Sequence, residues 1–154
     1  ELKQQLNVTE KGITRTTLLA LHACNDAVVQ SGLSHEELQS FDTALINGNT
    51  VGGMCLTDEL YQDANHRDIG SEYLSSYDLG SVGLYLQQRF GVNGVVNTFN
   101  TACSSSANAI MYGARLIKNG LAKRAIVGGA DSLAKFTING FSHNFVNRSI
   151  IIKI

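Results

Sequence analysis

The segment NTACSSSANA, residues 100–109, joins two patterns that together decide the fold. Before it, residues 95–101 (VVNTFNT) are rich in β-branched and aromatic residues, which is typical of a strand. After it, apolar residues recur at helical spacing: Ala107, Ile110, Met111, Ala114 and Ile117. Gly120 ends this second pattern. The sequence therefore predicts a strand, a tight turn that carries Cys103, and a helix.

The predicted position of Cys103 has chemical consequences. Free N–H groups and the dipole of the first helical turn favour a thiolate at that point. A turn from strand to helix also projects its side chain at the carboxyl edge of a sheet, where α/β proteins bind ligands. The small neighbours leave room for a carbonyl group, and the N–H of Cys103 can donate to the oxygen of a tetrahedral intermediate. This combination suits acyl transfer through a thioester.

A structural interpretation of the cysteines has to be weighed against this one. A lone cysteine is most often a small buried hydrophobe. That interpretation suits Cys24, which lies in an apolar stripe, and Cys55. The serines that follow Cys103 can equally be a helix-capping cluster. Position and spacing by themselves leave both interpretations of Cys103 open.

Two short apolar runs predict further strands, both of them buried. Residues 43–47 (TALIN) are bounded by glycine, and residues 125–127 (AIV) run into Gly128 and Gly129. Residues 125–127 form a βαβ unit with the strand and helix around Cys103, whose crossover is expected to be right-handed. Residues 43–47 add a further strand to the same sheet. The expected fold class is α/β, with a mainly parallel sheet and helices packed on it.

Helices are expected before and between these strands. Residues 14–32 carry a stripe at helical spacing: Leu19, Ala20, Ala23, Cys24, Ala27 and Val28. Ser34 and Glu37 fit a capping box for a short second helix. Asp78 fits the N-cap of a further helix that ends at Gly91. The polar stretch between the first strand and Asp78 predicts a short helix followed by a long loop, which in a compact domain is usually functional.

Composition limits the class of protein. The 154 residues suit one domain, and a net charge of −1, from 12 basic and 13 acidic residues without a basic run, argues against a nucleic-acid partner. No apolar run approaches the roughly 20 residues that span a bilayer, so no membrane contact is expected. Three scattered cysteines suit neither a disulfide framework nor a zinc site. A reducing compartment, the cytoplasm, is the expected location.

Several segments, in order, resemble β-ketoacyl-[acyl-carrier-protein] synthases, the condensing enzymes of fatty-acid and polyketide synthesis. Thr101-Ala-Cys-Ser-Ser-Ser106 resembles their active-site segment, and Asn49-Thr-Val-Gly-Gly-Met54 is similar to their glycine loop beside the acyl pocket. Ala114-Arg-Leu-Ile-Lys-Asn-Gly120 resembles the helix after the nucleophile. Ala125-Ile-Val-Gly-Gly-Ala-Asp131 resembles the following strand and acidic turn, and Gly140-Phe141 also matches. The resemblance covers about residues 14–141.

The resemblance implies half of a thiolase-like fold and a dimer. It implies that Cys103 is the nucleophile that accepts an acyl chain from the acyl-carrier protein. Decarboxylation of a malonyl thioester would then give a carbanion that attacks the acyl-enzyme and releases a β-ketoacyl thioester. No cofactor and no metal takes part in that chemistry.

The resemblance also suggests roles for other residues. Val51 aligns with a pocket residue that influences acyl-chain length, and Phe141 with a residue near the pocket mouth. Both are equally compatible with plain core positions. Asp131 is expected to be a structural hydrogen-bonding acid rather than a catalytic one. The strand before Cys103 is the one that usually pairs across the dimer interface.

The sequence departs from the family in two ways. Family members carry two histidines in a second half that follows the nucleophile, and none of the four histidines here lies in a matching motif: His22, His35, His66 and His143. Residues 1–141 are expected to be the N-terminal ketosynthase half without its first strand, and residues 142–154 a divergent tail. Such a half leaves apolar surface unpartnered, which predicts self-association or pairing with a second chain, and residues 150–152 of the tail could add a strand to a sheet edge.

Two functional hypotheses follow from these observations. In the first, the chain is the nucleophile-bearing half of a ketosynthase that requires the other half for condensation. In the second, it is a non-catalytic structural or interaction partner with the same fold. The intact segment around Cys103 favours the first hypothesis, and the absence of both histidines favours the second.

Overall fold

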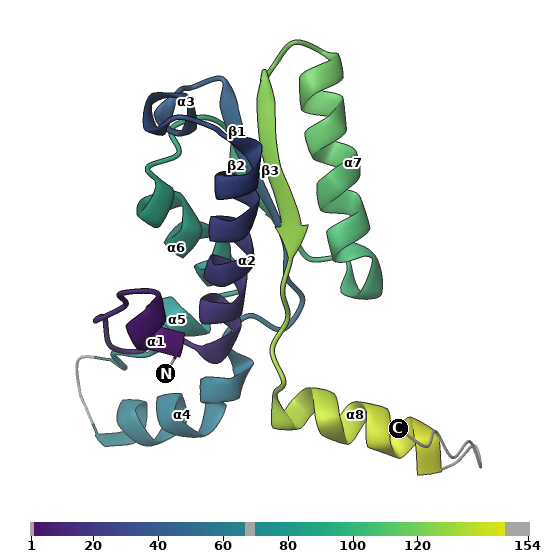
Figure 1. Ribbon diagram of the computed structural model, residues 1–154. Helices are drawn as coiled ribbons and strands as arrows, with labels where there is room; N and C mark the ends of the chain where they lie inside the picture. Colours follow the sequence, from purple (N-terminus) through teal and green to yellow (C-terminus); the bar gives the residue numbers. More distant parts are fainter. Residues whose placement is uncertain (1, 67–69, 147–154) are drawn as a thin grey trace.

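The computed structural model describes residues 2–66 and 70–146, with side chains up to residue 142. Its sheet, as described, has three parallel strands in the order β2-β1-β3 (Figure 1). They are β1 (Thr43–Gly48), β2 (Val96–Phe99) and β3 (Arg124–Gly129). All three were expected from the sequence within a few residues, and the prediction of an α/β fold with a parallel sheet is confirmed.

Helices lie on both faces of this sheet (Figure 1). The helices are α1 (Leu2–Gln5), α2 (Arg15–Ser31), α3 (His35–Gln39), α4 (Thr57–His66), α5 (Leu74–Tyr77), α6 (Ser81–Phe90), α7 (Ser105–Lys118) and α8 (Lys135–Val146), with two 3₁₀ turns, η1 (Met54–Leu56) and η2 (Ala102–Ser104). Helix α7 covers one face, α2 and α6 cover the other, and α8 leaves the end of β3 and extends away from the sheet. Within the described ranges, no helix is both long and apolar enough to cross a membrane.

The core has two parts because β1 is the central strand and alternate residues face opposite sides. Leu45 packs with the cluster formed by α2 and α6, which includes Leu21 and Val82. Ala44 and Ile46 pack with the cluster formed by α7. All six residues of β1 are buried, so this strand lies between the two parts of the core.

The local helix signals were partly correct. Ser34 and Glu37 form the predicted capping box, and Gly91 ends α6 in the left-handed conformation. The prediction of Asp78 as the N-cap of α6 is wrong, because Gly80 occupies that position. The Asp78 carboxylate instead accepts a hydrogen bond from the Gly80 N–H at 2.6 Å, one turn before the helix begins.

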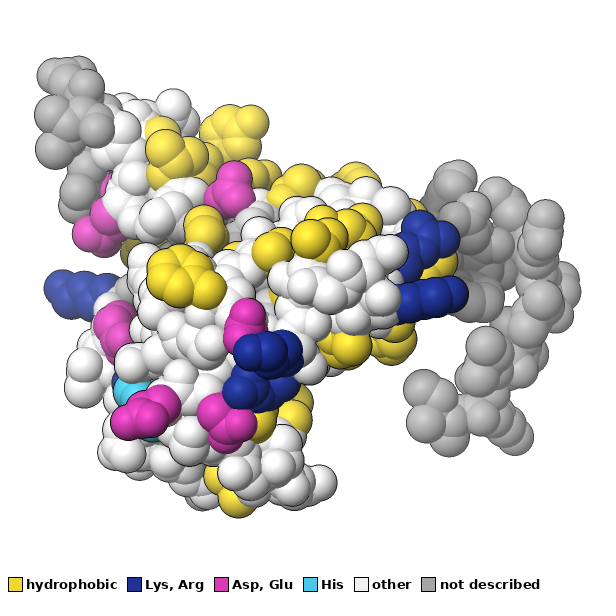
Figure 2. Space-filling view, turned by 90° about the horizontal axis from the view of Figure 1, so that it is seen from above, with side chains coloured by type: hydrophobic (Ala, Val, Ile, Leu, Met, Phe, Trp, Pro, Cys, Tyr) yellow, Lys and Arg dark blue, Asp and Glu magenta, His cyan; other side chains and the backbone are white. Residues whose placement is uncertain are grey.

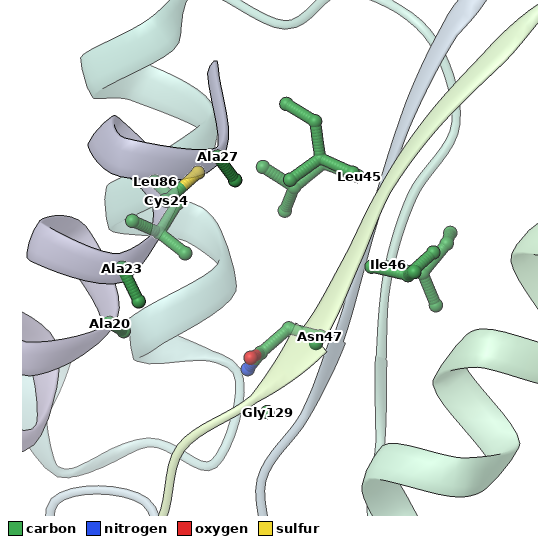
Figure 3. A pocket seen from close by; sticks show the side chains of 12 residues that line it. Ala20, Ala23, Cys24, Ala27, Leu45, Ile46, Asn47, Leu86 and Gly129 are labelled. Carbon is green, nitrogen blue, oxygen red and sulfur yellow. The ribbon is translucent and has the colours of Figure 1, made fainter. Parts of the chain in front are cut away.

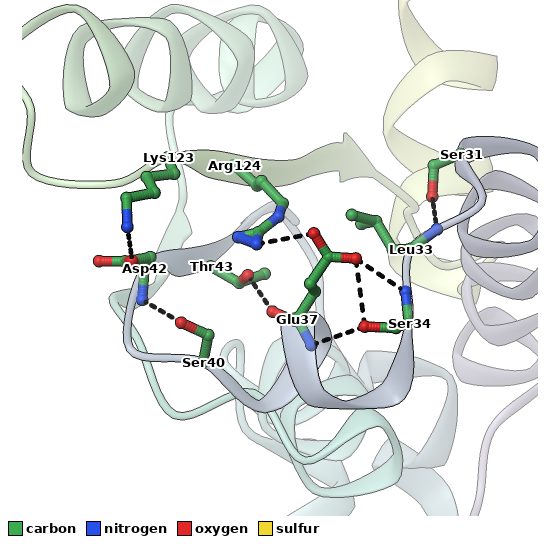
Figure 4. A network of polar contacts seen from close by, with 9 residues as sticks. All are labelled: Ser31, Leu33, Ser34, Glu37, Ser40, Asp42, Thr43, Lys123 and Arg124. Atoms are coloured by element: carbon green, nitrogen blue, oxygen red, sulfur yellow. Dashed lines mark hydrogen bonds and ion pairs between the residues drawn. The ribbon is translucent and has the colours of Figure 1, made fainter.

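A polar network fixes the ends at which β1 and β3 begin (Figure 4). The Glu37 carboxylate accepts hydrogen bonds from the Ser34 N–H at 3.0 Å and from Arg124 Nη2 at 3.0 Å. These contacts, the Ser34 backbone bond first, lower the pKa of Glu37. Lys123 and Asp42 add an ion pair at 2.6 Å. Helix α3 is thereby tied to the start of β3, which is an edge strand of the described sheet.

The predicted apolar stripe of α7 does not face the sheet. Ala107, Ile110, Met111, Ala114 and Ile117 are all exposed, Ile110 to 54%. The buried face instead carries smaller residues: Ser105, Ala109 and Gly113, with Leu116. The reason is a close helix–sheet contact, which only a face of small residues permits. Strand β3, predicted to be buried, is only partly so, because it is an edge strand.

Part of the predicted stripe of α2 lines a small cavity of about 120 Å³ against the sheet (Figure 3). Of this stripe only Cys24 is buried, as predicted, whereas Leu19, Ala23 and Ala27 are exposed, Leu19 to 48%. The prediction of this stripe as the buried face is therefore wrong in part, because the buried residues of α2 are Thr16, Thr17, Leu18, Leu21 and Cys24. Asn47 points into this cavity, and its Nδ2 has no hydrogen-bond partner among the described residues. The sheet face on this side is therefore less completely packed than the face under α7.

The amino end of α7 touches the carboxyl end of β1. A Cβ atom built on Gly48 would lie 2.6 Å from the backbone N of Ser106 and 2.7 Å from the carbonyl C of Ser105. Farther along α7, a Cβ atom on Gly113 would lie 2.4 Å from Val127 Cγ1. Glycine at these two positions is what lets the helix lie so close to the sheet.

Helix α8 runs without a break across residue 142, the predicted start of the tail. The predicted tail strand at residues 150–152 lies outside the described residues.

We expect Gly48→Ala to lower the free energy of unfolding by about 1–3 kcal/mol, because the added methyl group overlaps backbone atoms that cannot rotate away. Urea unfolding followed by circular dichroism measures this change. Gly128→Ala is the matched control, since a Cβ atom there meets nothing within 4 Å. Equal effects of the two substitutions would contradict the proposed close contact.

Candidate active site at the amino end of α7

A sharp elbow joins β2 to α7 and carries Cys103. The strand ends at Phe99, the 3₁₀ turn η2 (Ala102–Ser104) follows, and α7 begins at Ser105. Ala102 has φ = 50°, in the left-handed region, which costs a non-glycine residue roughly 1–2 kcal/mol. Cys103 is exposed immediately after this residue. Its location on an open turn before a helix is the one that the sequence predicted.

The serines after Cys103 stabilise this elbow. The Ser105 hydroxyl accepts from the Thr101 N–H at 2.9 Å and donates to the Ala102 carbonyl at 2.7 Å. The Ser104 hydroxyl donates to the Thr101 carbonyl at 2.7 Å. Ser104 makes no side-chain cap bond to α7. The serine cluster therefore holds the turn before the helix rather than capping the helix itself.

The loop after β1, residues 49–53, lies beside the elbow. Asn49 is buried, and its side chain donates to the Ala130 carbonyl at 2.9 Å and accepts from the Gly52 N–H at 2.5 Å. The Asp131 carboxylate accepts from the backbone N–H groups of Thr50 at 3.2 Å and Val51 at 2.9 Å. These bonds confirm Asp131 as a structural hydrogen-bonding acid. They tie the loop after β1 to the loop after β3.

The three predicted site residues line one cavity. Val51, Cys103 and Phe141 border a space of about 430 Å³, into which the loop after β1, the elbow and α8 project. Its other lining residues are Thr50, Ala102, Asp131, Ser132, Phe136, Thr137 and Gly140. Val51 is buried, whereas Phe136 and Phe141 are exposed to 66% and 57%. An aliphatic residue thus lies in the interior and two aromatic rings lie at the solvent side.

A second, smaller pocket of about 170 Å³ is also lined by Cys103. It is lined by backbone and small polar residues that include Thr50, Ser105, Ser106 and Asp131. Cys103 therefore lines both a largely apolar space and a polar one.

Among the residues whose side chains the structure describes, no histidine lines either of the two pockets next to Cys103. His22 lies on α2, with Nε2 3.9 Å from the Asp26 carboxylate, and His66 Nδ1 lies 2.6 Å from the Gln62 carbonyl oxygen. Within the described part of the chain, no three His, Cys, Asp or Glu side chains gather as a metal site would require. The described residues thus supply a thiol without an imidazole beside it.

The other two cysteines differ from each other. Cys24 is buried, as predicted, and burial raises the pKa of its thiol to about 11. The prediction of Cys55 as a buried residue is wrong, because it lies exposed in η1. A three-residue turn has one side open to solvent, and no periodicity in the sequence revealed it.

Sequence reasoning did not single out two residues that organise the site, Thr50 and Ser105. Both were part of segments that had been recognised, but their hydroxyl groups carried no sequence signal of their own. Their role depends on the register of the parallel strands, which pairs Gly48 with Phe99 and with Gly129. That register brings the loops after all three strands to one edge of the sheet.

Comparisons with known proteins agree with this geometry. The family described as "Beta-ketoacyl synthase, N-terminal domain" matches residues 7–145. The chain is 29% identical over 122 residues to "Putative polyketide beta-ketoacyl synthase 1" of Streptomyces cyaneus, which covers 73% of this chain and 29% of that protein. It is 41% identical over 86 residues to "Probable polyketide synthase 17" of Dictyostelium discoideum, over 53% of this chain and 3% of that protein.

Solved structures show the same fold. "The ishigamide ketosynthase/chain length factor" superimposes with a TM-score of 0.76 at 21% identity, over 86% of this chain and 34% of that one. The ketosynthase ApeO, solved in complex with its chain length factor ApeC from Xenorhabdus doucetiae, superimposes with a TM-score of 0.65 at 31% identity, over 92% and 36%. This chain therefore spans about a third of the solved chains to which it is similar.

A parallel sheet with an exposed cysteine on a strand-to-helix elbow defines a thiol-bearing member of the thiolase-like α/β fold, as the sequence predicted. With the match over residues 7–145, the chain belongs to the β-ketoacyl synthase family through the N-terminal domain of that family.

We expect Asp131→Ala to speed amide hydrogen exchange at Thr50 and Val51 and to lower the free energy of unfolding by about 1–2 kcal/mol, because both N–H groups lose their acceptor. Exchange measured by NMR tests this residue by residue. Asp26→Ala, which removes an exposed carboxylate on α2, is the control. Unchanged exchange at Thr50 and Val51 would show that Asp131 does not hold the loop.

Proposed function

We propose that this chain is the nucleophile-bearing part of a ketosynthase that acts in polyketide synthesis, and that Cys103 carries the acyl group. The observation that carries the proposal is the position of Cys103, exposed on the elbow at the amino end of α7 and lining the cavity of about 430 Å³. A thiol at such a place is accessible to a thioester, and its thiolate is the form that attacks in acyl transfer.

The acylation step needs only groups that this chain supplies and a thioester substrate. The Cys103 thiolate attacks the thioester carbonyl carbon, so a new C–S bond forms and the carbonyl oxygen becomes an oxyanion. We propose that the N–H of Cys103 donates to that oxyanion. Collapse of the intermediate breaks the original C–S bond and expels the carrier thiolate, which takes a proton from water. The acyl chain then remains on Cys103.

The condensation step needs more than the described residues supply. A malonyl thioester loses CO2, its carbanion attacks the acyl group on Cys103, and the Cys103 thiolate leaves. In the family that the chain resembles, two histidines assist this step from the second half. Neither pocket beside Cys103 has a histidine among its described lining residues. We therefore propose that the described residues suffice to accept an acyl group, and that condensation requires groups beyond them.

The cavity suggests where the acyl chain lies. Val51 is buried at one side and its backbone N–H is fixed by Asp131, so we propose that it limits chain length. Phe136 and Phe141 from α8 would form the mouth of the cavity. A change at Val51 is therefore proposed to alter substrate size rather than the chemistry at the sulfur.

Acyl-carrier protein and a second ketosynthase-type chain are the proposed partners. Among the similar solved structures, one is a type II polyketide acyl-carrier protein in complex with its ketosynthase, and others pair a ketosynthase with a chain length factor. In the described sheet β2 pairs only with β1, which leaves its other edge available for a homodimer or a related chain. The polyketide relatives favour that pathway over fatty-acid synthesis.

Incubation with a hexanoyl thioester of N-acetylcysteamine is expected to add one hexanoyl group at Cys103, detected by peptide mass spectrometry, because this thiol alone combines exposure with the elbow. Addition of a malonyl thioester should yield no condensation product from this chain by itself. Cys103→Ala should abolish the adduct and Cys55→Ala should retain it. Acylation of Cys55 at an equal rate, or none at Cys103, would refute the proposed function.

A second candidate function rests on a different observation, the exposed apolar stripe of α7. Ile110, Met111 and Ile117 are exposed to 54%, 44% and 45% and lie on one side of the helix. Hydrophobic side chains gather in patches on the face shown in Figure 2. Contiguous exposed apolar surface usually marks an interface. A non-catalytic chain could use this stripe to bind a partner.

Sedimentation velocity is expected to show a concentration-dependent shift toward larger species, because the α7 stripe gains from being covered. Ile110→Glu combined with Ile117→Glu should return the chain to a monomer. Val29→Glu, at a side chain on α2 exposed to 78%, is the control and should leave association unchanged. A wild-type chain that stays monomeric at all concentrations would contradict self-association through this stripe.

A further inference from the structure

The orientation of one peptide group decides whether Cys103 can stabilise an oxyanion. The N–H of Cys103 belongs to the same planar unit as the carbonyl of Ala102, and in this trans peptide the two groups point in opposite directions. Whatever fixes the Ala102 carbonyl therefore also fixes the direction of the Cys103 N–H. Because Ala102 is a non-glycine residue with φ = 50°, this orientation has to be maintained by its surroundings.

Three donors converge on the Ala102 carbonyl oxygen. The Ser105 hydroxyl donates at 2.7 Å, and the Ser105 backbone N–H closes the 3₁₀ turn on the same oxygen. The third donor is the Thr50 hydroxyl, at 3.1 Å. Both contacts from Ser105 are local to the turn. Thr50 is 52 residues away in sequence and reaches the elbow from the loop after β1.

Thr50 is itself held on three sides. Its N–H donates to the Asp131 carboxylate at 3.2 Å, and its carbonyl accepts from Asn100 Nδ2 at 3.3 Å. Its hydroxyl also lies 3.3 Å from the Ser105 hydroxyl. The backbone of Thr50 is thus anchored by the loops after β2 and β3, while its hydroxyl contacts the elbow. An anchored donor can fix a peptide plane, whereas a freely rotating one cannot.

We propose that Thr50 is a positioning residue that holds the Ala102–Cys103 peptide plane and thereby aims the Cys103 N–H at the oxyanion of the acylation step. The inference rests on the proposed acyl transfer to Cys103. A hydrogen bond to the carbonyl also polarises the peptide group, which makes its N–H a better donor. Thr50 does not touch the reacting atoms and acts only through this peptide.

Two reactions of the same thiol separate this role from a general structural one. Alkylation by iodoacetamide requires an accessible thiolate but forms no oxyanion, whereas acylation by the hexanoyl thioester requires the N–H donor as well. Thr50→Val is expected to slow acylation of Cys103 about tenfold, a fraction of the loss caused by removing an oxyanion donor outright. Alkylation of Cys103 should change by less than about twofold, because the thiol stays exposed. Thr50→Ser, which keeps the hydroxyl, should restore acylation.

The matched control is Thr57→Val, because the Thr57 hydroxyl also donates to a backbone carbonyl, that of Met54 at 2.7 Å, but lies outside both pockets beside Cys103. This variant should leave both reactions unchanged. The ¹H–¹⁵N resonance of the Cys103 amide gives a second readout, which is expected to shift in Thr50→Val and to stay in place in Thr50→Ser and Thr57→Val. Melting temperatures identify any variant that has lost its fold.

The outcomes distinguish this inference from the proposed function. Equal slowing of acylation and alkylation in Thr50→Val, or no slowing of acylation, would overturn the role of Thr50 while leaving acyl transfer intact. A wild-type chain that is alkylated but never acylated at Cys103 would instead refute the proposed function. In that case the Cys103 amide resonance still decides whether Thr50 holds the peptide plane, and an unshifted resonance in Thr50→Val overturns the inference.

Discussion

The contact between the carboxyl end of β1 and the amino end of α7 is the constraint on which the rest of the structure depends. Gly48 permits it, because a side chain there would overlap the backbone of Ser105 and Ser106. With the helix this close, the chain has only a short turn in which to pass from β2 into α7. Ala102 adopts a left-handed conformation in that turn, and Cys103 is left exposed at the end of the helix.

Parallel pairing gathers the remaining parts of the site. The three strands end in register, so their following loops meet at one edge of the sheet. Hydrogen bonds from polar side chains to backbone groups then hold these loops. Asp131 and Asn49 link the loop after β1 to the loop after β3, and Ser105 fixes the turn after β2. The site is therefore held by hydrogen bonds between segments that lie about 50 to 80 residues apart in sequence.

The same contact explains the surface that remains open. Because α7 turns its small residues to the sheet, its larger apolar side chains face outward. The chain belongs to the β-ketoacyl synthase family but spans about a third of the solved relatives. An exposed stripe on the helix that carries the nucleophile is consistent with a surface that another polypeptide covers. The proposed catalytic function thus uses the amino end of α7, and the proposed structural function uses the exposed side of the same helix.

The sequence by itself determined the three strands, the helix after Cys103 and the turn between them, because these follow from local composition and spacing. It also indicated Val51, Cys103 and Phe141, which the structure places around one cavity. Only the tertiary structure decided which face of α7 is buried. The helix approaches the sheet so closely that only the face with the smaller side chains fits against it. It alone revealed the contact of Thr50 with Ala102 and the exposure of Cys55, because both depend on how distant segments meet rather than on local pattern.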